Sequence, residues 1–323
     1  MKTNTGFKTR SLWKAVGFEA IAVLAAVTGV FSQPSLVGGA YTLPPTVWKD
    51  AAGRPLPFQS GREIEDFLRT APIVDDERIP EGITRPRKVL LEQDGIQIYA
   101  CFRNVKVYRR RMELEGGRVR IDFRDDAIFE VAAYEFGKLL GLNNIPPTVE
   151  RRIRGRRGTL QIWVPEAMME KERMKKGIQP PMRWRWTMEL QIMRLFDNLI
   201  FNDDRNAGNI LIDSNWKVWM IDHTRSFRTF KQLPDPKAIL FCERTVWSNL
   251  KRLDATTVRE RLKPYLGSRE IKTLLKRRDR ALRYIQELID ERGENQVLFS
   301  LLPDIPSGPG HQTWVQAGIP SWD

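Results

Sequence analysis

The sequence predicts an α+β fold of two lobes, with a strand-rich first half and a helix-rich second half. Residues 87–111 alternate apolar and polar side chains, as two or three strands do. Beyond Pro180-Pro181 the apolar residues recur at helical spacing, most clearly over 186–201 and 268–293. The boundary between the lobes is therefore expected near residues 165–180. A chain of 323 residues is long enough for two lobes that share a sizeable core.

Shifts in composition divide the chain into five segments. The five segments are a signal-like stretch (1–32), a Pro/Gly-rich linker (33–60), the strand-rich lobe (61–165), the helical lobe (166–300) and a tail (301–323). The first folded element is expected to be a short helix over 61–74, which a proline ends. Asp94-Gly95 then predicts a tight hairpin, and the stretch LEGGRVRIDF (114–123) adds a turn and a further strand.

A helix follows these strands, because residues 128–140 carry apolar side chains at helical spacing. Either residue of the Asp125-Asp126 pair is suited to cap its start, and Gly141 is expected to end it. After the helix come a strand, a basic hairpin around Gly155, and a strongly apolar strand over 159–164. We expect this last strand to lead into the connection between the lobes.

Residues 1–32 have the pattern of an export signal. The apolar run AIAVLAAVTGVF (20–31) is short for a membrane span, and Glu19 interrupts its extension. Val30 and Ser32 fit the small-residue positions before a cleavage point. The basic residues that precede the run are Lys2, Lys8, Arg10 and Lys14. Export to the periplasm or the medium is expected, and a buried N-terminal helix or an uncleaved membrane anchor remains the alternative.

The composition is that of a basic globular protein with few cysteines and histidines. The net charge of +13 favours anionic partners, although a generally basic surface explains it equally well. Cys101 and Cys242 permit one optional disulfide but no disulfide framework. His223 and His311 are the only histidines, which argues against zinc sites and most histidine-based catalysis.

Polar residues interrupt an apolar region in the stretch LIFNDDRNAGNILIDSNWKVWMIDHTRSF (199–227). The segments ILID and KVWMID predict a hairpin of two short strands, whose geometry brings Asp204, Asn209 and Asp222 to one end. Two carboxylates and an amide oxygen are hard ligands suited to Mg²⁺ or Mn²⁺ carrying a phosphate chain. Each residue taken alone fits a loop or a cap, but the spacing of all three fits phosphoryl transfer.

This spacing resembles that of protein kinases, in which a catalytic-loop Asp is followed five residues later by a metal-binding Asn and further on by a metal-binding Asp. DRNAGN with MID is similar to the atypical form found in phosphatidylinositol 3-/4-kinases and in secretory-pathway kinases related to the Golgi casein kinase. EVAAYEFGKLLGLNNIPPTVERRI (130–153) resembles the secretory-pathway kinases more specifically. The resemblance covers roughly residues 85–230 and implies a two-lobed protein-kinase-like fold.

The resemblance also implies roles for individual residues. Asp204 is expected to orient or deprotonate the acceptor hydroxyl, and Asn209 and Asp222 to hold the metal ions. Glu130 is expected to organise the ATP phosphates, although the helical wheel turns it away from the apolar stripe that contains Glu135. Asp125, at the helix cap, is a further acidic candidate beside Glu130. Arg103 or Lys106 is expected to be the phosphate-binding cation. The backbone from Val164 through Glu166 to Ala167 is expected to face adenine.

Three departures from the kinase pattern keep the function open. An Arg at 103 stands where the family has Lys, and its planar fork is not equivalent to an ammonium group. Residues 92–98 contain a single glycine, and His223-Thr224 replaces the usual Phe-Gly after Asp222. The sequence thus predicts an ATP-dependent phosphotransferase that requires Mg²⁺ or Mn²⁺ and acts on a protein or glycan hydroxyl. If the basic run at 151–157 recruits the acceptor, we expect the acceptor to be acidic. The alternatives are a pseudokinase that binds nucleotide without transfer and, less favoured, a basic nucleic-acid-binding protein.

Overall fold

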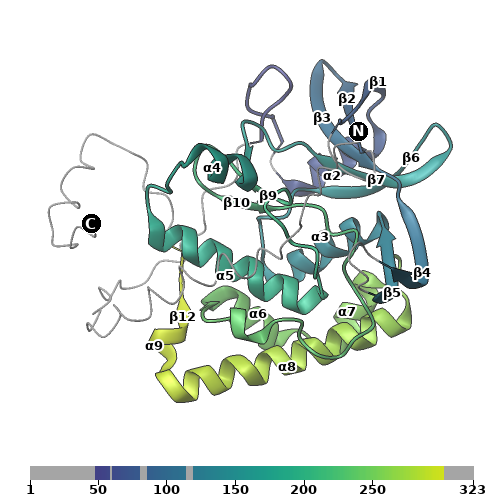
Figure 1. Ribbon diagram of the computed structural model, residues 1–323. Helices are drawn as coiled ribbons and strands as arrows, with labels where there is room; N and C mark the ends of the chain where they lie inside the picture. Colours follow the sequence, from purple (N-terminus) through teal and green to yellow (C-terminus); the bar gives the residue numbers. More distant parts are fainter. Residues whose placement is uncertain (1–47, 59, 81–85, 114–118, 302–323) are drawn as a thin grey trace, which may run out of the picture.

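The computed structural model describes residues 48–58, 60–80, 86–113 and 119–301. This part of the chain has the expected α+β fold of two lobes, with a sheet in one lobe and helices in the other (Figure 1). The signal-like stretch 1–32, residues 33–47 of the linker and nearly all of the tail lie outside the described residues. Within the described ranges, none of the helices combines the length and the apolar character that crossing a bilayer requires.

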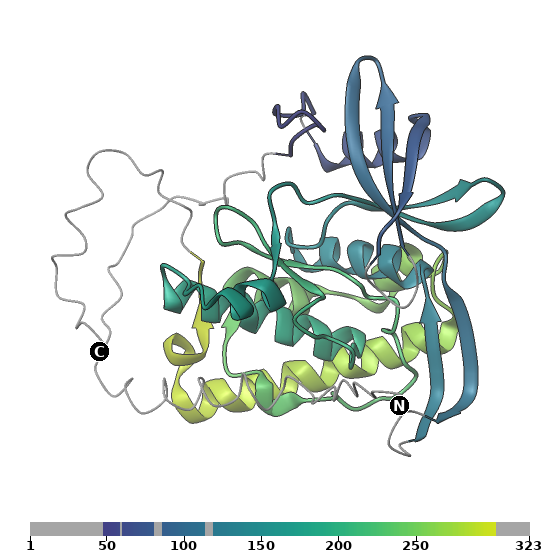
Figure 2. The same ribbon diagram turned by 45° about the horizontal axis from the view of Figure 1, so that its top comes forward.

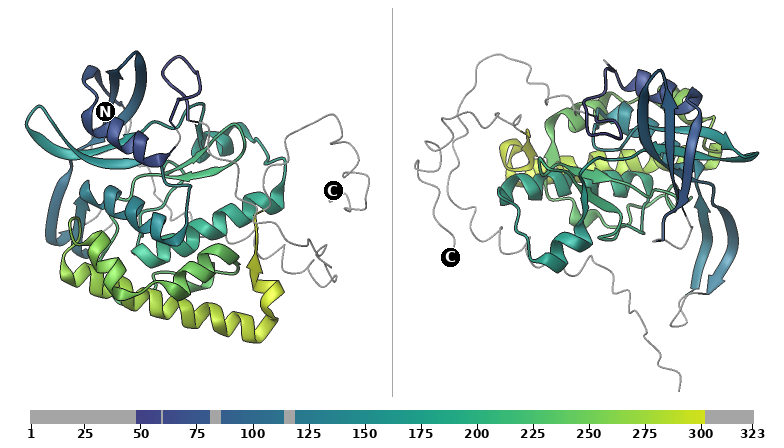
Figure 3. Two further views of the ribbon diagram at one scale, coloured as in Figure 1. Left: turned by 180° about the vertical axis from the view of Figure 1, so that it is seen from behind. Right: turned by 90° about the horizontal axis from the view of Figure 1, so that it is seen from above.

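The strand-rich lobe is built on a five-stranded antiparallel sheet that α2 covers. The helix α2 (Gly61–Thr70) begins with a capping box between Ser60 and Glu63 and buries Ile64, Phe67 and Leu68 against the sheet. Seen from behind in Figure 3, α2 lies across one face of the strands. The predicted hairpin at Asp94-Gly95 is confirmed, with both residues at positive φ. The strands in spatial order are β1 (Ile73–Arg78), β2 (Arg87–Gln93), β3 (Ile96–Arg103), β7 (Arg156–Ile162) and β6 (Thr148–Ile153).

The next two strands leave this sheet. The strands β4 (Lys106–Glu113) and β5 (Val119–Asp126) form a separate two-stranded ribbon, which descends beside the helical lobe in Figures 1 and 2. Arg124 of β5 forms an ion pair with Glu270, and Arg228 donates to the carbonyl oxygen of Ile121 at 2.7 Å. The strand-rich region expected over 61–165 therefore includes a hairpin that is fixed to the other lobe.

The helix α3 (Ile128–Leu140) lies between the two lobes and is buried on almost every side. Most of its apolar side chains join the core of the helical lobe, although the sequence places residues 128–140 in the strand-rich lobe. Gly141 ends the helix in the left-handed conformation, as predicted. Asp126 supplies the start, since its carboxylate accepts from the backbone N–H of Ile128 at 3.1 Å, whereas Asp125 has another partner.

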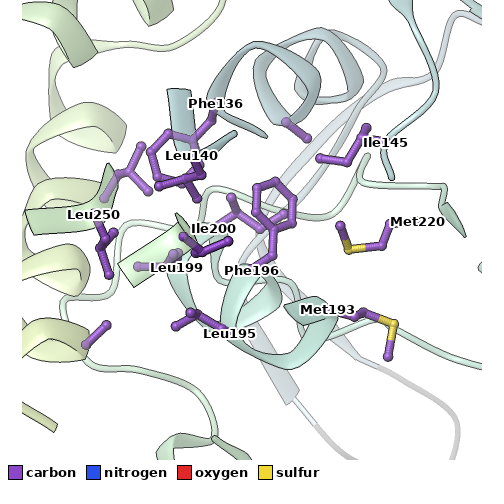
Figure 4. Close-up of a cluster of buried hydrophobic side chains, with 14 of the residues drawn as sticks. Phe136, Leu140, Ile145, Met193, Leu195, Phe196, Leu199, Ile200, Met220 and Leu250 are labelled. Atoms are coloured by element: carbon purple, nitrogen blue, oxygen red, sulfur yellow. The ribbon is translucent and has the colours of Figure 1, made fainter. Parts of the chain in front are cut away.

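The helical lobe packs around α5 (Arg183–Ile200) and α8 (Ser268–Arg292), both of which the sequence predicts within a few residues. Figure 4 shows the part of the core around α5, where Phe136 of α3 stacks on Phe196 of α5 with ring centroids 6.0 Å apart. The other elements of this lobe are β8 (Met168–Met169), α4 (Glu170–Lys176), β9 (Ile210–Ile212), β10 (Val218–Met220), η1 (Pro236–Ala238), β11 (Cys242–Glu243), α6 (Arg244–Arg252), α7 (Ala255–Leu262), α9 (Glu294–Val297) and β12 (Leu298–Phe299).

Residues 48–58 form a strap that joins the lobes at their connection. Trp48 packs against the core of the strand-rich lobe and also against Trp219 of β10, with ring centroids 5.1 Å apart. Lys49 forms an ion pair of 2.7 Å with Glu166 of the connection. Cys101 and Cys242 are buried as free thiols in different lobes, so the optional disulfide does not form.

Candidate functional site

A cavity of about 570 Å³ lies between the lobes, and both lobes contribute to its lining. The end of β3 and the connection after β7 line it from the strand-rich side. The loop after α5 and the segment after β10 line it from the helical side. The sequence candidates that line it are Arg103, Asp125, Val164, Asp204, Asn209 and Asp222.

Asp204 and Asn209 are brought together by the loop that follows α5. The helix ends at Ile200 and is capped by Phe201, whose φ of 54° turns the chain away from the helix axis. The Asn202 side chain accepts from the backbone N–H of Asp204 at 3.1 Å. The amide of Asn209 donates to the carbonyl oxygen of Asp204 at 3.3 Å. The five-residue spacing thus closes a compact loop with both side chains at the cavity.

Asp222 reaches the same loop through the predicted hairpin. β9 and β10 pair antiparallel, with Ile210 opposite Met220, and the N–H of Ile221 donates to the Asn209 carbonyl oxygen at 3.3 Å. Asp222 has a φ of 59°, a conformation that costs a residue other than glycine about 1–3 kcal/mol. Its carboxylate accepts from the Thr224 hydroxyl at 3.1 Å. Such strain is common where a fold must aim a functional side chain, and Asp222 lines the cavity.

Arg205 fastens this loop from beneath and is itself buried. Its guanidinium donates to both carboxylate oxygens of Asp197, each at 2.9 Å. It also donates to the carbonyl oxygens of Asn209 and Ile221, at 2.7 and 2.6 Å. One side chain therefore holds the end of α5, the metal-binding candidate Asn209 and the start of the Asp222 segment in one arrangement. Because Arg205 directly follows Asp204, the sequence predicts that it ties the loop to a neighbouring carboxylate or to backbone carbonyl oxygens, and the structure has these contacts.

Replacing Arg205 by Ala is expected to lower the melting temperature and transfer activity together. The change leaves Asp197, which is 1% exposed, as an unpaired buried charge, and breaking such a pair typically costs about 3–5 kcal/mol. Thermal melts and a transfer assay on the same preparation measure both effects, and Arg62→Ala at an exposed position is the control. A variant that melts like the parent but has no activity would instead assign Arg205 a direct catalytic role.

A buried charge cluster lies beneath the cavity. The guanidinium of Arg103 is 3.6 Å from the carboxylate of Glu130, and a second oxygen of Glu130 lies 3.1 Å from Nδ1 of His223. Burial by itself would raise the pKa of Glu130, but Arg103 and His223 hold it below its usual value. Burial opposes the charge of Arg103 as well, yet Cys101, Glu130 and Asp222 raise the pKa of its guanidinium. The cluster therefore keeps an ionised pair at the base of the cavity.

The structure separates the three acidic candidates around α3. Glu130 is fully buried, contrary to the helical-wheel interpretation, because α3 is enclosed on nearly all sides and has no single apolar stripe. Glu135 is paired with Lys138 and Arg261 and does not line the cavity. Asp125 does line it.

Of the two candidate phosphate-binding cations, Arg103 is at the cavity and Lys106 is not. β3 ends at Arg103, and the chain then leaves the sheet, so Lys106 lies exposed at the start of β4. The end of β3 also approaches β7 closely, since a side chain at Gly158 would meet the Arg103 carbonyl oxygen at 2.3 Å.

The two residues predicted to flank adenine face different ways. Val164 is buried and lines the cavity between the lobes. Glu166 is exposed, has a φ of 54°, and pairs with Lys49. It lines a separate cavity of about 220 Å³ beside the strap, so the expectation that Glu166 belongs to the nucleotide site has no geometric support.

Sequence reasoning did not assign Arg225 to the site, although it contacts the catalytic candidate. Its guanidinium donates to the carboxylates of Asp125 at 2.8 Å and Asp204 at 3.0 Å, and it lies over the ring of Phe123. Asp125 and Phe123 belong to β5, so Arg225 connects the β4–β5 hairpin to the catalytic-loop candidate. The sequence shows only that Arg225 lies three residues after Asp222, a position from which it is a candidate partner for Asp222 itself.

Replacing Arg225 by Gln is expected to lower the transfer rate about tenfold, while ATP affinity stays within a few-fold of the parent. The change removes the donor that fixes the Asp204 carboxylate, and loss of orientation worth about 1.4 kcal/mol corresponds to that factor. The transfer rate and KM for ATP separate the two effects, and Arg225→Lys, which keeps the charge, should recover part of the rate. An unchanged rate in Arg225→Gln would exclude a positioning role.

The oxygen donors in the cavity fit a divalent cation that also binds phosphate. In the described part of the chain, no three His, Cys, Asp or Glu side chains are grouped to hold a metal by themselves. Mg²⁺ sites in phosphoryl transfer need only one or two protein oxygens, with phosphates and water completing the octahedron. Asp222 and Asn209 offer such oxygens, and Oδ1 of Asp125 at the same cavity is buried without a hydrogen-bond donor among the described residues.

Comparison with known proteins identifies the fold. No protein-family model matches the chain, and no curated protein matches it in sequence. The solved structure of hydra Fam20 with sugar matches with a TM-score of 0.58 at 16% identity, over 75% of this chain and 94% of that chain. The Golgi casein kinase matches with a TM-score of 0.54 at 15% identity, over 74% of this chain and 79% of that chain. Its structure with Mn/ADP bound gives the same score and identity over 76% and 80%.

The fold is kinase-like and similar to that of Fam20 and the Golgi casein kinase. This confirms the protein-kinase-like, two-lobed architecture, and at the level of the fold it supports the more specific of the two resemblances. The resemblance to phosphatidylinositol 3-/4-kinases remains a prediction. Because the identities are low, the likeness concerns the fold, and the activity has to be argued from the residues of this cavity.

Proposed function

We propose that this chain is an ATP- and divalent-metal-dependent phosphotransferase that acts on a hydroxyl group of a protein or glycan outside the cytoplasm. The observation that carries the proposal is the meeting of Asp204, Asn209 and Asp222 at one cavity above the Arg103–Glu130 pair. Both lobes are needed to build that arrangement. Solved structures of the same fold include one with Mn/ADP and one with sugar, which supports nucleotide and hydroxyl acceptor as the substrate classes.

The cavity residues divide the work of binding ATP. Asn209 and Asp222 hold Mg²⁺ or Mn²⁺, and the ion supplies charge neutralisation to the phosphate chain. Arg103 contacts the phosphates, and Glu130 holds the guanidinium in place from below. The backbone around Val164, at the connection between the lobes, faces adenine. These contacts position the nucleotide, and positioning is the larger part of phosphoryl-transfer catalysis.

Asp204 serves the acceptor. In the proposed transfer the acceptor hydroxyl oxygen forms a bond to the γ-phosphorus of ATP, the bond from that phosphorus to the β–γ bridging oxygen breaks, and ADP leaves. Asp204 orients the hydroxyl and takes its proton. The Asp204 side chain is 30% exposed, so an incoming acceptor can reach it.

A transfer assay tests the proposal. Purified protein is incubated with γ-labelled or α-labelled ATP, with Mg²⁺ or Mn²⁺, and with casein or a mixture of glycans as acceptor. We expect label from the γ position only and dependence on the metal. Label from the α position would indicate transfer of AMP, and metal-dependent ATP binding without any transfer would favour the second function below.

A pseudokinase, which binds nucleotide without transferring phosphate, is the second candidate. The observation that favours it is the engagement of Asp204 by Arg225 at 3.0 Å, which occupies one oxygen of the catalytic candidate. The Arg at 103 and the His223-Thr224 pair after Asp222 also depart from active kinases. The transfer assay distinguishes the two candidates, since both bind ATP and metal.

The proposed site of action makes a prediction of its own. Expressed in a bacterium with its native N-terminus, the chain should leave the cytoplasm and lose about thirty residues, because the basic and apolar pattern of residues 1–32 is what translocation machinery recognises. Cell fractionation and intact-mass measurement test this. A variant with Val23→Arg and Leu24→Arg, which interrupts the apolar run, should stay inside. A full-length parent found soluble in the cytoplasm would contradict export.

A further inference from the structure

The end of α4, the loop after it and the first turn of α5 (residues 173–186) form a corner whose exposed side chains are mainly apolar or cationic. Met174, Met182 and Trp184 are 47%, 55% and 47% exposed, which places them among the most exposed large apolar residues of the described chain. No acidic residue occurs from 173 to 188. The exposed cations of this stretch are Lys175, Lys176 and Arg183.

Internal contacts hold this α4–α5 corner in a fixed shape. Arg173 pairs with Glu170, donates to the carbonyl oxygen of Ile178 and lies over the ring of Trp186. Trp186 is buried against Trp216, with ring centroids 6.2 Å apart. One arginine thus fastens α4, the loop and the first turn of α5 to one another.

This anchoring turns Trp184 outward. Two residues along a helix correspond to about 200°, so the inward side chain of Trp186 requires Trp184 to point to the opposite side. The corner lies at the end of the molecule away from the β4–β5 hairpin, as Figures 1 and 2 show. It therefore presents tryptophan, methionine and cationic side chains outward from a rigid base, without the entropy cost of ordering a loop on binding.

We propose that the α4–α5 corner is a docking surface for an anionic lipid bilayer. Tryptophan is favoured at the interface between headgroups and acyl chains, and methionine adapts to irregular apolar contacts. Lys175, Lys176 and Arg183 match the negative charge of the headgroups, and each cation near such a surface strengthens binding about fivefold. A protein partner with an acidic surface would match the charge as well, but two of the three exposed cations are lysines, which protein interfaces disfavour.

Docking at this corner has a consequence for the cavity between the lobes. Lys171 of α4 lines that cavity, and its backbone N–H donates to the carbonyl oxygen of Ala207 in the catalytic loop at 3.0 Å. A bilayer seated on the corner would therefore lie beside one edge of the cavity. The surface does not depend on the proposed function, since lipid binding can be measured without ATP or an acceptor.

Sedimentation with vesicles tests the surface. The full chain is mixed with vesicles of phosphatidylcholine alone, or of phosphatidylcholine in which about 30% of the lipid is phosphatidylglycerol. Each mixture is tested at about 0.1 and 0.5 M salt. We expect binding to the anionic vesicles only, weakened by salt. The variant Lys175→Gln/Lys176→Gln/Arg183→Gln should bind roughly a hundredfold more weakly. The matched control Lys272→Gln/Lys276→Gln/Arg280→Gln removes three exposed cations from α8 and should bind like the parent.

A second measurement follows Trp184 directly. Brominated phosphatidylcholine in the anionic vesicles quenches tryptophans that enter the bilayer, and Trp184→Phe should lose most of that quenching while melting like the parent. Tyr108→Phe, on the β4–β5 hairpin, should leave it unchanged. The proposal is overturned if the parent does not bind the anionic vesicles. It is also overturned if the two triple variants lose binding equally or if neither loses it, because net charge or another segment such as residues 20–31 would then account for the binding.

Discussion

Asp204→Asn is expected to lower phosphotransfer by about 10²–10⁴-fold while ATP and metal binding stay close to those of the parent. The amide keeps the size of the side chain and its contact with Arg225, but it cannot accept the proton of the acceptor hydroxyl. Asp204 acts chiefly when the acceptor is present, whereas Asn209 and Asp222 are the proposed metal ligands. A thermal shift with ATP and Mn²⁺, paired with the transfer assay on the same sample, measures both properties.

Asp203→Asn is the matched control for this experiment. It makes the same chemical change at the neighbouring residue. Asp203 pairs with Arg228 at 2.6 Å and does not line the cavity. We expect it to reduce stability but to keep transfer within a few-fold of the parent. If Asp204→Asn transfers phosphate as well as the parent does, the catalytic assignment is wrong, and a group on the acceptor or elsewhere in the cavity must take the proton.

The part of the site that is local in sequence could be predicted. Asp204, Asn209 and Asp222 fall within 19 residues, and a short antiparallel hairpin leaves their backbones few alternative arrangements. The turn at Asp94-Gly95 and the end of α3 at Gly141 were predictable for the same reason, because the left-handed conformation required there selects residue types. The structural role of Arg205 was predictable from its position next to Asp204 in the loop. A buried arginine can donate to several carbonyl oxygens at once, as Arg205 does to those of Asn209 and Ile221.

The contacts that the sequence could not supply join distant segments. The Arg225–Asp125 pair spans 100 residues, and the β4–β5 hairpin meets the helical lobe through Arg124 and Glu270, which are 146 residues apart. Neither contact leaves a periodic signal. The wheel misplaced Glu130 because it assumes one apolar face, whereas α3 is buried between both lobes.

Asp222→Asn is expected to abolish most metal-dependent ATP binding, and transfer with it. Asp222 is the one carboxylate among the two proposed metal ligands, so its replacement leaves an ion of charge +2 with neutral protein oxygens only. The left-handed backbone at 222 tolerates Asn as readily as Asp, so the fold should survive the change.

Titrating ATP with and without Mn²⁺ isolates the metal-dependent part of the binding. The parent should show a thermal shift that requires the metal, Asp204→Asn should keep that shift, and Asp222→Asn should lose it while melting without ligand like the parent. Retention of the metal-dependent shift in Asp222→Asn would move the metal site to other oxygens of the cavity, of which the buried Oδ1 of Asp125 is the first to test. If the parent shows the shift but transfers phosphate to no acceptor, the pseudokinase hypothesis becomes the better account, because the metal ligands would then be intact and the step assigned to Asp204 absent.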